Sequence, residues 1–379
     1  MMDIFASFGV NGCVEVGADA ISSEVFDLSA RNNIELCRSR LQSLSVHSIE
    51  RFSELVVNGF NSFHIACKKG YLEMALLLLD YNKNLLTSRT SDDRNGLMLA
   101  ILSDHLHVVK TLMTILTSSN IELENYFLSK NNLNTLIHYA CWSGSYATCT
   151  YLIDECHLQH ELRNKEGLLP IHLAISRNDS KIVEYMLIKA GSSELTASPT
   201  GYSLFHKCCL HGSYESLKVI LKYAFDSNHP SLLTTNGSTG LHLASNAGYS
   251  LVVEYLLTNY KTEINVNHQN EYGNSALMLA CVHGHLDIIK MILEHDGDIN
   301  LLNSNGANGF TLAASSGRYD TCKYLFYNTN ININIIDGDG NSCIDSALDS
   351  GYKEVASKLA LLQAIKIKVD KIKSSIRVN

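Results

Sequence analysis

The sequence predicts an all-α solenoid, in which short helix–turn–helix units stack side by side and are joined by short hairpin-like turns. Three observations predict this fold. A short pattern recurs nine times in 379 residues, glycines stand at two fixed places in the pattern, and the whole chain has only three prolines. Hydrophobic residues make up 46% of the chain, which is enough for a buried core and argues against global disorder.

The recurring pattern is an apolar segment with a small residue near its start. Six copies align without gaps: FHIACKKGYLEMALLLL, IHYACWSGSYATCTYLI, IHLAISRNDSKIVEYML, FHKCCLHGSYESLKVIL, LHLASNAGYSLVVEYLL and LMLACVHGHLDIIKMIL, and weaker copies begin at Leu97, Phe310 and Ile344. The small residue recurs every 33 to 40 positions, at Ala66, Ala100, Ala140, Ala174, Cys208, Ala244, Ala280, Ala313 and Ala347. One such unit cannot bury its apolar face alone, so the copies are expected to stack.

Glycines mark the ends of the predicted elements. In seven copies a glycine follows the small residue by four positions and can end the first helix in the left-handed conformation: Gly70, Gly144, Gly212, Gly248, Gly284, Gly317 and Gly351. A second helix with helical apolar spacing follows, as at Val252, Val253, Leu256 and Leu257. Further glycines suit the tight turn before the next copy: Gly167, Gly201, Gly237, Gly273, Gly306 and Gly340.

These copies resemble the ankyrin repeat, whose signature is T-P-L-H-x-A. GLLPIHLA, ending at Ala174, keeps the proline, histidine and alanine, whereas GSTGLHLA, ending at Ala244, keeps the threonine and histidine but has Gly240 in place of proline. The resemblance covers roughly residues 57–362. It departs from the signature where other residues replace the histidine: Met98, Met278, Thr311 and Asp345.

The repeat positions divide the chain into four predicted parts. Residues 1–20 show no pattern, residues 21–57 form a degenerate N-terminal capping repeat, residues 58–362 form the repeat array, and residues 363–379 form a basic amphipathic C-terminal helix. Wider spacing between copies predicts longer loops around residues 117–133 and 225–236.

Composition limits the classes of function. The net charge of −8 argues against a nucleic-acid binder, although seven Lys/Arg and only two Asp/Glu follow from Lys353 onward. We expect no secretory signal or transmembrane segment, because no Lys or Arg precedes Arg31 and no apolar run approaches the ~18 residues that span a bilayer. Eleven cysteines, mostly inside helical patterns, favour a reducing cytoplasmic or nuclear setting.

Residues that resemble reactive groups are better explained by packing. Histidines 64, 138, 172, 206 and 242 recur once per repeat, about 10 Å apart, which is too far to share a metal ion. The ankyrin resemblance implies a structural hydrogen-bonding role for them. Cys149, Cys156, His157 and His160 could suggest zinc, but Cys149 has a buried second-helix register. Cys209 and His211 are two positions apart and face different sides of a helix. No catalytic motif is present, so we expect no enzyme activity, cofactor or metal.

The resemblance also implies where a partner protein would bind. Turn tips and the exposed face of the first helices line a concave groove in ankyrin arrays. Large or charged residues at the matching positions are candidates for partner binding: Trp142, Leu168, Tyr202, Leu210, His211, Tyr272, Lys68 and Lys69. The alternative for Trp142, the sole tryptophan, is that it packs against neighbouring repeats or under the long loop.

The C-terminal segment carries a narrow apolar stripe. Its members are spaced 3, 4, 3 and 4 positions apart, like a coiled-coil seam: Leu362, Ile365, Val369, Ile372 and Ile376. Lys366, Lys368, Lys373 and Arg377 flank the stripe. It predicts either a helix that caps the last repeat, or a surface for self-association or for an anionic membrane.

Together these features predict a non-enzymatic scaffold, adaptor or inhibitor that binds one partner protein through the groove. The alternatives are a substrate-recruiting regulatory subunit of an enzyme complex and a microbial effector that acts on host proteins. The groove is the variable part of such folds, so the sequence does not identify the partner.

Overall fold

A computed structural model describes residues 18–43, 57, 59–119, 126–190, 201–223, 229 and 232–377, with the backbone alone for 18–22, 190 and 369–377. The unpatterned residues 1–17 and parts of the two predicted loops, 120–125 and 225–228, lie outside these ranges. The chain divides into two compact units, Met1–Leu173 and Ala174–Asn379, and the division falls inside helix α11 (Pro170–Ser176).

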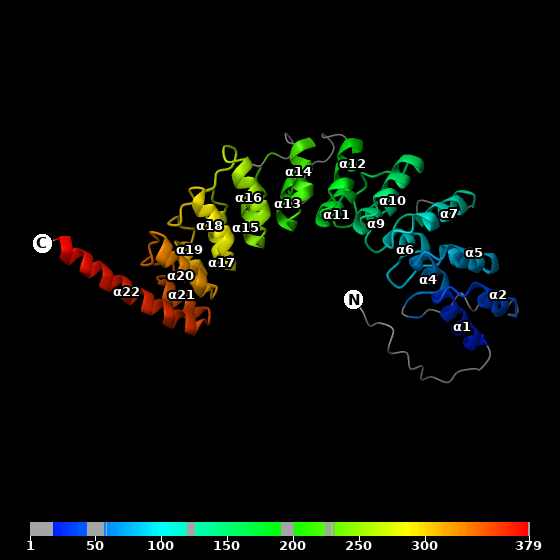
Figure 1. Ribbon diagram of the computed structural model, residues 1–379, viewed down its shortest axis with the longest axis horizontal. Helices are drawn as coiled ribbons and strands as arrows, with labels where there is room; N and C mark the ends of the chain where they lie inside the picture. Colours follow the sequence, from blue (N-terminus) through cyan, green and yellow to red (C-terminus); the bar gives the residue numbers. More distant parts are fainter. Residues whose placement is uncertain are drawn as a thin grey trace. The chain divides into compact units, whose positions relative to one another are not determined.

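The first unit is a series of antiparallel helix pairs (Figure 1). The pairs are α1 (Ala18–Ala30) with α2 (Ile34–Gln42), α4 (Ser62–Lys69) with α5 (Leu72–Tyr81), α6 (Gly96–Leu102) with α7 (Leu106–Thr117), and α9 (Leu136–Ser143) with α10 (Tyr146–Thr150). A 3₁₀ turn, η1 (Lys83–Thr87), follows α5, and a π-helical turn, η2 (Tyr151–Glu155), continues α10. Equivalent helices of successive pairs pack together, α1 on α4, α4 on α6, and α6 on α9.

The second unit repeats this arrangement. After α12 (Ser180–Ala190) come α13 (Leu204–His211) with α14 (Tyr214–Tyr223), α15 (Gly240–Ala247) with α16 (Ser250–Asn259), α17 (Ala276–His283) with α18 (Leu286–Glu294), α19 (Gly309–Ser315) with α20 (Tyr319–Asn328), and α21 (Cys343–Asp349) with α22 (Lys353–Arg377). First helices pack in series from α13 to α21. The described residues of both units are therefore helical, with only isolated bridges at the turns, which confirms the predicted all-α solenoid.

The two ends of the array have the following structure. Helices α1 and α2 pack on α4 and α5, the first pair of the regular array. At the other end, α22 begins as the second helix of the last pair and runs without a break to Arg377. The four-part division of the chain, with boundaries at 20, 57 and 362, stays a prediction.

Glycines end the first helices as expected. All seven glycines after the small residue, and all six turn glycines, have positive φ, from 68° to 87°. The copies without such a glycine keep the same backbone with other residues. Asp104 and Asn178 end the first helix at φ 57°, while Asp93 and Leu133 take the turn position at φ 63° and 56°. The repeat geometry thus holds where its usual residue is missing, and Leu133 is the least suited to this conformation.

In four repeats the start of the first helix is fixed by a capping box whose histidine also reaches the next repeat. In α15 the backbone N–H of Thr239 donates to Nδ1 of His242, which places the imidazole proton on Nε2. Nε2 then donates to the carbonyl of Asn274, 3.0 Å away. Equivalent bonds run from His64 to Ser88, from His138 to Leu168 and from His206 to Leu232.

Two of the copies that lack the histidine make the same connection through an asparagine. Asn95 caps Met98 through Oδ1 and donates from Nδ2 to the carbonyl of Tyr126, 2.8 Å away. Asn308 caps Thr311 and donates to the carbonyl of Asn332 in the same way. In the last copy Asp345 forms the capping box with Ser342.

Gly240 shows how tightly the pairs stack. A Cβ atom at this position would lie 2.4 Å from Cε1 and Cζ of Phe205 and 2.8 Å from Sγ of Cys209, both in the preceding first helix. A Cβ atom at Gly96 would collide with the ring of Phe63 in the same way. At positions 96 and 240 glycine replaces the signature proline and leaves room for the buried phenylalanine ring of the previous repeat.

We predict that Gly240→Ala destabilises the protein by about 1–3 kcal/mol, because overpacking against Phe205 outweighs the better helix propensity of alanine. Urea unfolding monitored by circular dichroism measures the loss. Phe205→Leu should restore most of it in the double variant, since a leucine leaves room for the added methyl group. Equal losses from Gly240→Ala in both backgrounds would contradict this packing account.

Candidate functional site

The hairpin-like turns between pairs form one backbone series within each unit. In the second unit, Glu271 N–H donates to Asn236 O, Ser304 N–H to Tyr272 O, and Gly338 N–H to Asn305 O, at 2.7 to 3.1 Å. In the first unit, Lys165 N–H donates to Asn132 O at 2.9 Å. These backbone bonds hold neighbouring turns together along with side-chain bonds such as Asn164 to Asn134 and Asn303 to Asn274, none of which uses the side chain of Tyr272.

Trp142 lies near the end of α9 and is 51% exposed. It is therefore a surface residue within its unit, although Ala140 and Cys141 beside it are completely buried. Leu168 is half-buried just before the next first helix, and its carbonyl accepts the bond from His138. A tryptophan with half of its surface in water gains little from the stacking of repeats.

Leu133 belongs to the same repeat as Trp142 and was missed by sequence reasoning. Its side chain is 40% exposed and its backbone is left-handed, a conformation that costs a residue other than glycine about 1–2 kcal/mol. Seven other copies, including the one with Gly59, have glycine at this turn position, so a leucine there could have been noticed in the sequence. An exposed apolar side chain on an unfavourable backbone supports a role other than stability.

Tyr202 and Leu210 in the second unit are both half-buried. The ring of Tyr202 packs edge-on against His206, with 6.1 Å between centroids, and Nζ of Lys207 lies 5.3 Å from its ring centroid. His211 is exposed, and partial burial together with the nearby charge of Lys207 lowers its pKa. These residues form an aromatic and cationic surface. The ring of Tyr202 already packs against His206 and Lys207 of its own repeat.

Tyr272 is more exposed than Trp142, at 62% of its surface. The turn series holds its backbone, so the phenol extends from a fixed tip. Leu243, Leu279 and Leu312 were not predicted, yet each is half-buried at the position before the small residue of α15, α17 and α19. Their recurrence before Ala244, Ala280 and Ala313 is the signal that could have identified them.

Lys68 and Lys69 have contacts at the N-terminal end of the array. Nζ of Lys69 donates to the carbonyl of Ala30, the last residue of α1, at 2.7 Å. Nζ of Lys68 lies 5.0 Å from the centroid of the Phe60 ring. Lys69 therefore connects α1 to the array, and of the two lysines Lys68 is the better candidate for a partner contact.

The predicted strip from Trp142 to Tyr272 falls in both units. Trp142 and Leu168 belong to the first unit, whereas Tyr202, Leu210 and Tyr272 belong to the second. That they act as one continuous surface stays a prediction.

The cysteines and histidines have the environments of packing residues. Cys67, Cys141, Cys149, Cys209 and Cys281 are buried. Burial raises the pKa of Cys209, so its thiol is protonated and poorly suited to pair with His211 as a nucleophile. In the part of the chain that the structure describes, no three His, Cys, Asp or Glu residues lie close enough together to hold a metal ion. No described helix combines the length and the apolar character needed to cross a membrane.

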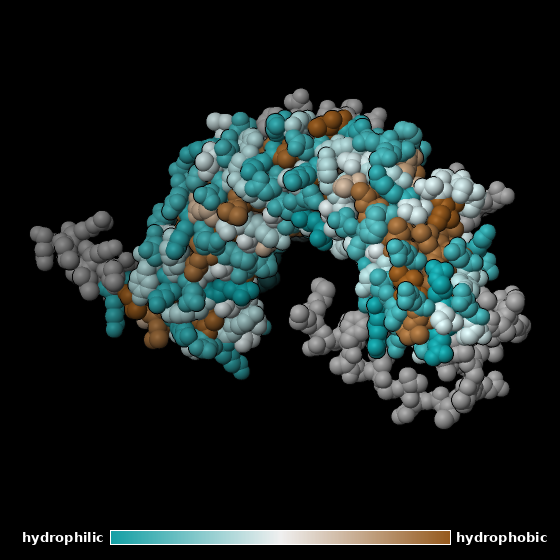
Figure 2. Space-filling model, turned by 45° about the vertical axis from the view of Figure 1, so that its right-hand side comes forward, coloured by the Kyte–Doolittle hydropathy of each residue, from teal (hydrophilic) through white to brown (hydrophobic). Residues whose placement is uncertain are grey.

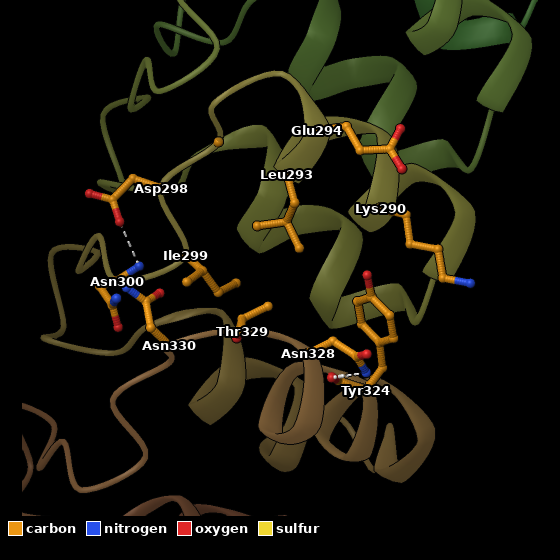
Figure 3. A pocket seen from close by; sticks show the side chains of 11 residues that line it. Lys290, Leu293, Glu294, Asp298, Ile299, Asn300, Tyr324, Asn328, Thr329 and Asn330 are labelled. Carbon is orange, nitrogen blue, oxygen red and sulfur yellow. Dashed lines mark hydrogen bonds between the residues drawn. The ribbon is translucent and has the colours of Figure 1, made fainter.

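The hollows on the described surface include one that is polar and one that is mostly apolar. The first, about 550 Å³, lies where α18 and α20 end (Figure 3). Its lining is polar, with Glu294, Asp298 and Asn300 on one side and Tyr324 on the other; the side chain of Asp298 accepts from the N–H of Asn300 at 2.8 Å. The second, about 450 Å³, is mostly apolar and is formed by Phe127, Leu128, Leu136, Ile137, Leu158 and Leu162. The second hollow suits an apolar side chain better.

Comparisons with known proteins identify the class. A family model described as "Ankyrin repeats (3 copies)" matches residues 28–125, 63–161, 115–198, 137–231 and 205–303, and one described as "Ankyrin repeats (many copies)" matches residues 310–360. The chain therefore belongs to the ankyrin-repeat family. Its repeats are protein–protein interaction modules, and the family is in general non-catalytic.

Curated relatives share this family over part of their length. The chain is 27% identical over 176 residues to the target of rapamycin complex 2 subunit AVO2 of Saccharomyces cerevisiae, covering 46% of this chain and 39% of that protein. It is 30% identical over 284 residues to the ankyrin repeat and KH domain-containing protein mask-1 of Caenorhabditis elegans, covering 74% and 10%. The nuclear factor NF-kappa-B p105 subunit of Gallus gallus is 24% identical over 242 residues, covering 64% and 21%. The chain thus spans two fifths or less of the length of each.

The buried histidines predict a loss of stability in mild acid. Burial lowers the pKa of His64 and His242 to about 4, from 6.5, against the opposing effect of the carbonyl each one faces. The unfolded chain therefore binds more protons between pH 6.5 and 4, so stability is complete above pH 6.5 and falls as pH decreases. Protonation linked to each of these histidines should lower the free energy of unfolding by about 2 kcal/mol between pH 7 and pH 5.

Urea unfolding at pH 7 and pH 5 measures this dependence. His242→Gln should lower stability at pH 7 but reduce the difference between the two pH values, while Leu251→Ala, at an exposed residue that carries no titrating group, should leave that difference unchanged. An unchanged difference in His242→Gln would show that His242 is not the titrating group.

Proposed function

We propose that this chain is a non-enzymatic adaptor or scaffold, which binds a partner protein through the turn tips and the exposed ends of its first helices. The observation that carries the proposal is the exposure of large apolar and aromatic side chains at repeat positions that stacking does not require. Trp142 and Tyr272 are each more than half exposed on backbone that the array already holds. Tryptophan and tyrosine are the residues that most often dominate binding energy in protein interfaces.

The repeat of Trp142 is the strongest part of this proposal. It combines Trp142, the left-handed Leu133 on the preceding turn, and the apolar hollow lined by Leu136 and Ile137 of α9. A partner segment with apolar side chains would bury these surfaces, whereas a polar partner would leave them in water. The proposed setting is the cytoplasm or nucleus, because the buried cysteines are accounted for as thiols.

Recruitment within a larger enzyme complex is the second candidate. One relative is named as a subunit of target of rapamycin complex 2, which favours a part in a multi-subunit assembly in general terms. The same surface would then recruit a substrate or hold a subunit. The partner recovered in the experiment below distinguishes the two candidates.

We predict that Trp142→Ala reduces partner capture at least about ten-fold while the unfolding midpoint stays nearly unchanged, since half of the side chain is already in water. Affinity capture from cell extract, compared by quantitative mass spectrometry, measures the ratio. The matched control is Leu251→Ala on α16, which removes a similarly exposed apolar side chain away from the proposed surface. Recovery of an enzyme complex would favour the second candidate; equal capture by both variants would exclude Trp142 from the surface.

Leu133→Gly separates binding from stability. Glycine relieves the left-handed backbone, so the free energy of unfolding should stay level or rise by up to about 1 kcal/mol. Capture of the same partner should nevertheless fall, because the apolar side chain is lost. A large loss of stability would show that Leu133 is part of the core.

A further inference from the structure

The last helix of the array is longer than its position in the fold requires. α22 has 25 residues, whereas the equivalent second helices α16, α18 and α20 have 9 or 10. Helical backbone therefore continues for about fifteen residues, or about 22 Å, beyond the usual length. Short helices without tertiary support are marginal in water, so this extension is suited to pair with something.

The contacts of α22 show which of its faces the array uses. Ala356, Leu359 and Leu362 are buried against the array, and Nζ of Lys366 donates to the carbonyl of Ile331 at 3.1 Å. On another face, Leu361 is 66% exposed and Ile365 is 43% exposed. Figure 2 shows hydrophobic surface next to the grey atoms at this end of the chain. The array thus covers one face of the helix and leaves an apolar one open.

The open face continues the spacing of a coiled-coil seam. With the buried Leu362 setting the register at heptad position a, Ile365 at d is the first open member of the seam, and the sequence repeats the pattern at Val369, Ile372 and Ile376 on backbone that is helical to Arg377. Leu361, at the neighbouring g position, adds an exposed apolar side chain beside the seam. The capping interpretation accounts for the first turns of α22 but not for this open face.

The charges beside the seam decide the kind of partner. Positions e and g set partner choice in coiled coils, and here they hold Lys366, Lys368 and Lys373. In a coiled coil between two copies of this chain, lysines would face lysines. In a parallel pair a position g faces a position e, and in an antiparallel pair g faces g and e faces e. Like charges therefore oppose self-association, whereas glutamates at these positions of a partner would attract.

A membrane surface fits the helix less well. Helices that lie in a membrane interface usually present a broad apolar face with large aromatic residues. This segment has a narrow stripe, and no aromatic residue follows Tyr352. We propose that the free part of α22 forms a short coiled coil with an acidic amphipathic helix of a partner protein, at a site separate from the turn tips.

A designed peptide tests this proposal with the full chain. The probe is a labelled three-heptad peptide with isoleucine and leucine at a and d and glutamate at e and g, and its binding is measured by fluorescence anisotropy. One control peptide has the same composition in scrambled order, and another has lysine at e and g. We expect the acidic heptad peptide to bind at least about ten-fold more tightly than either control.

Variants of the chain then identify the surface. Leu361→Ser with Ile365→Ser should weaken peptide binding at least about ten-fold, and both residues are exposed enough for the fold to persist, which a thermal melt checks. Leu251→Ser, at an equally exposed leucine on α16, should have no effect. Lys368→Glu with Lys373→Glu should transfer the preference to the lysine peptide.

Three results would overturn the proposal. The first is equal binding of the scrambled and heptad peptides, which would show that binding depends only on the net charge of the peptide. The second is self-association of the free chain in sedimentation at the concentrations used. The third is binding to vesicles that contain phosphatidylserine without heptad-dependent peptide binding, which would assign the helix to a membrane surface. None of them bears on the turn-tip surface, because Trp142→Ala tests that surface separately.

Discussion

In six repeats the stacking of the helix pairs uses the same hydrogen bond, which connects the start of a first helix to the chain entering the next pair. Where histidine is present, its Nδ1 accepts from the capping backbone and its Nε2 donates across the repeat boundary, as His242 does to Asn274. Where it is missing, Asn95 and Asn308 cap the helix and make the crossing bond with one amide side chain. The requirement is a group that accepts locally and donates to the next repeat, and neutral imidazole and carboxamide both satisfy it.

This bond explains why the repeats can vary so much elsewhere. The backbone of several turns is held by the cap of the following helix and by bonds between neighbouring tips. Side chains at the tips and at the exposed ends of the first helices therefore contribute little to stacking. That freedom accounts for Trp142 and Tyr272 and for a leucine, rather than glycine, at the left-handed position 133.

Each end of a stacked array has one face without a neighbouring repeat. At the N-terminal end, α1 and α2 pack on the first regular pair, and Lys69 connects them to it. At the C-terminal end, α22 covers the last pair with its first turns and then extends past it. The same helix closes the array and presents a new surface, since its two functions use different faces.

The sequence alone determined the period and the helix pairs, because these depend on residues that recur at fixed spacing, and its resemblance to the ankyrin repeat implied the structural role of the buried histidines. It also placed the left-handed glycines, whose φ requirement is local. Tertiary structure alone decided which recurring positions stay open to solvent: Trp142 is exposed, Lys69 is bonded to α1, and Ile365 faces away from the array. It also showed that Asp104, Asn178 and Leu133 adopt the glycine conformation. The exposure of a residue depends on which side chains the neighbouring repeat packs against it. The sequence of one repeat does not specify these contacts between distant segments.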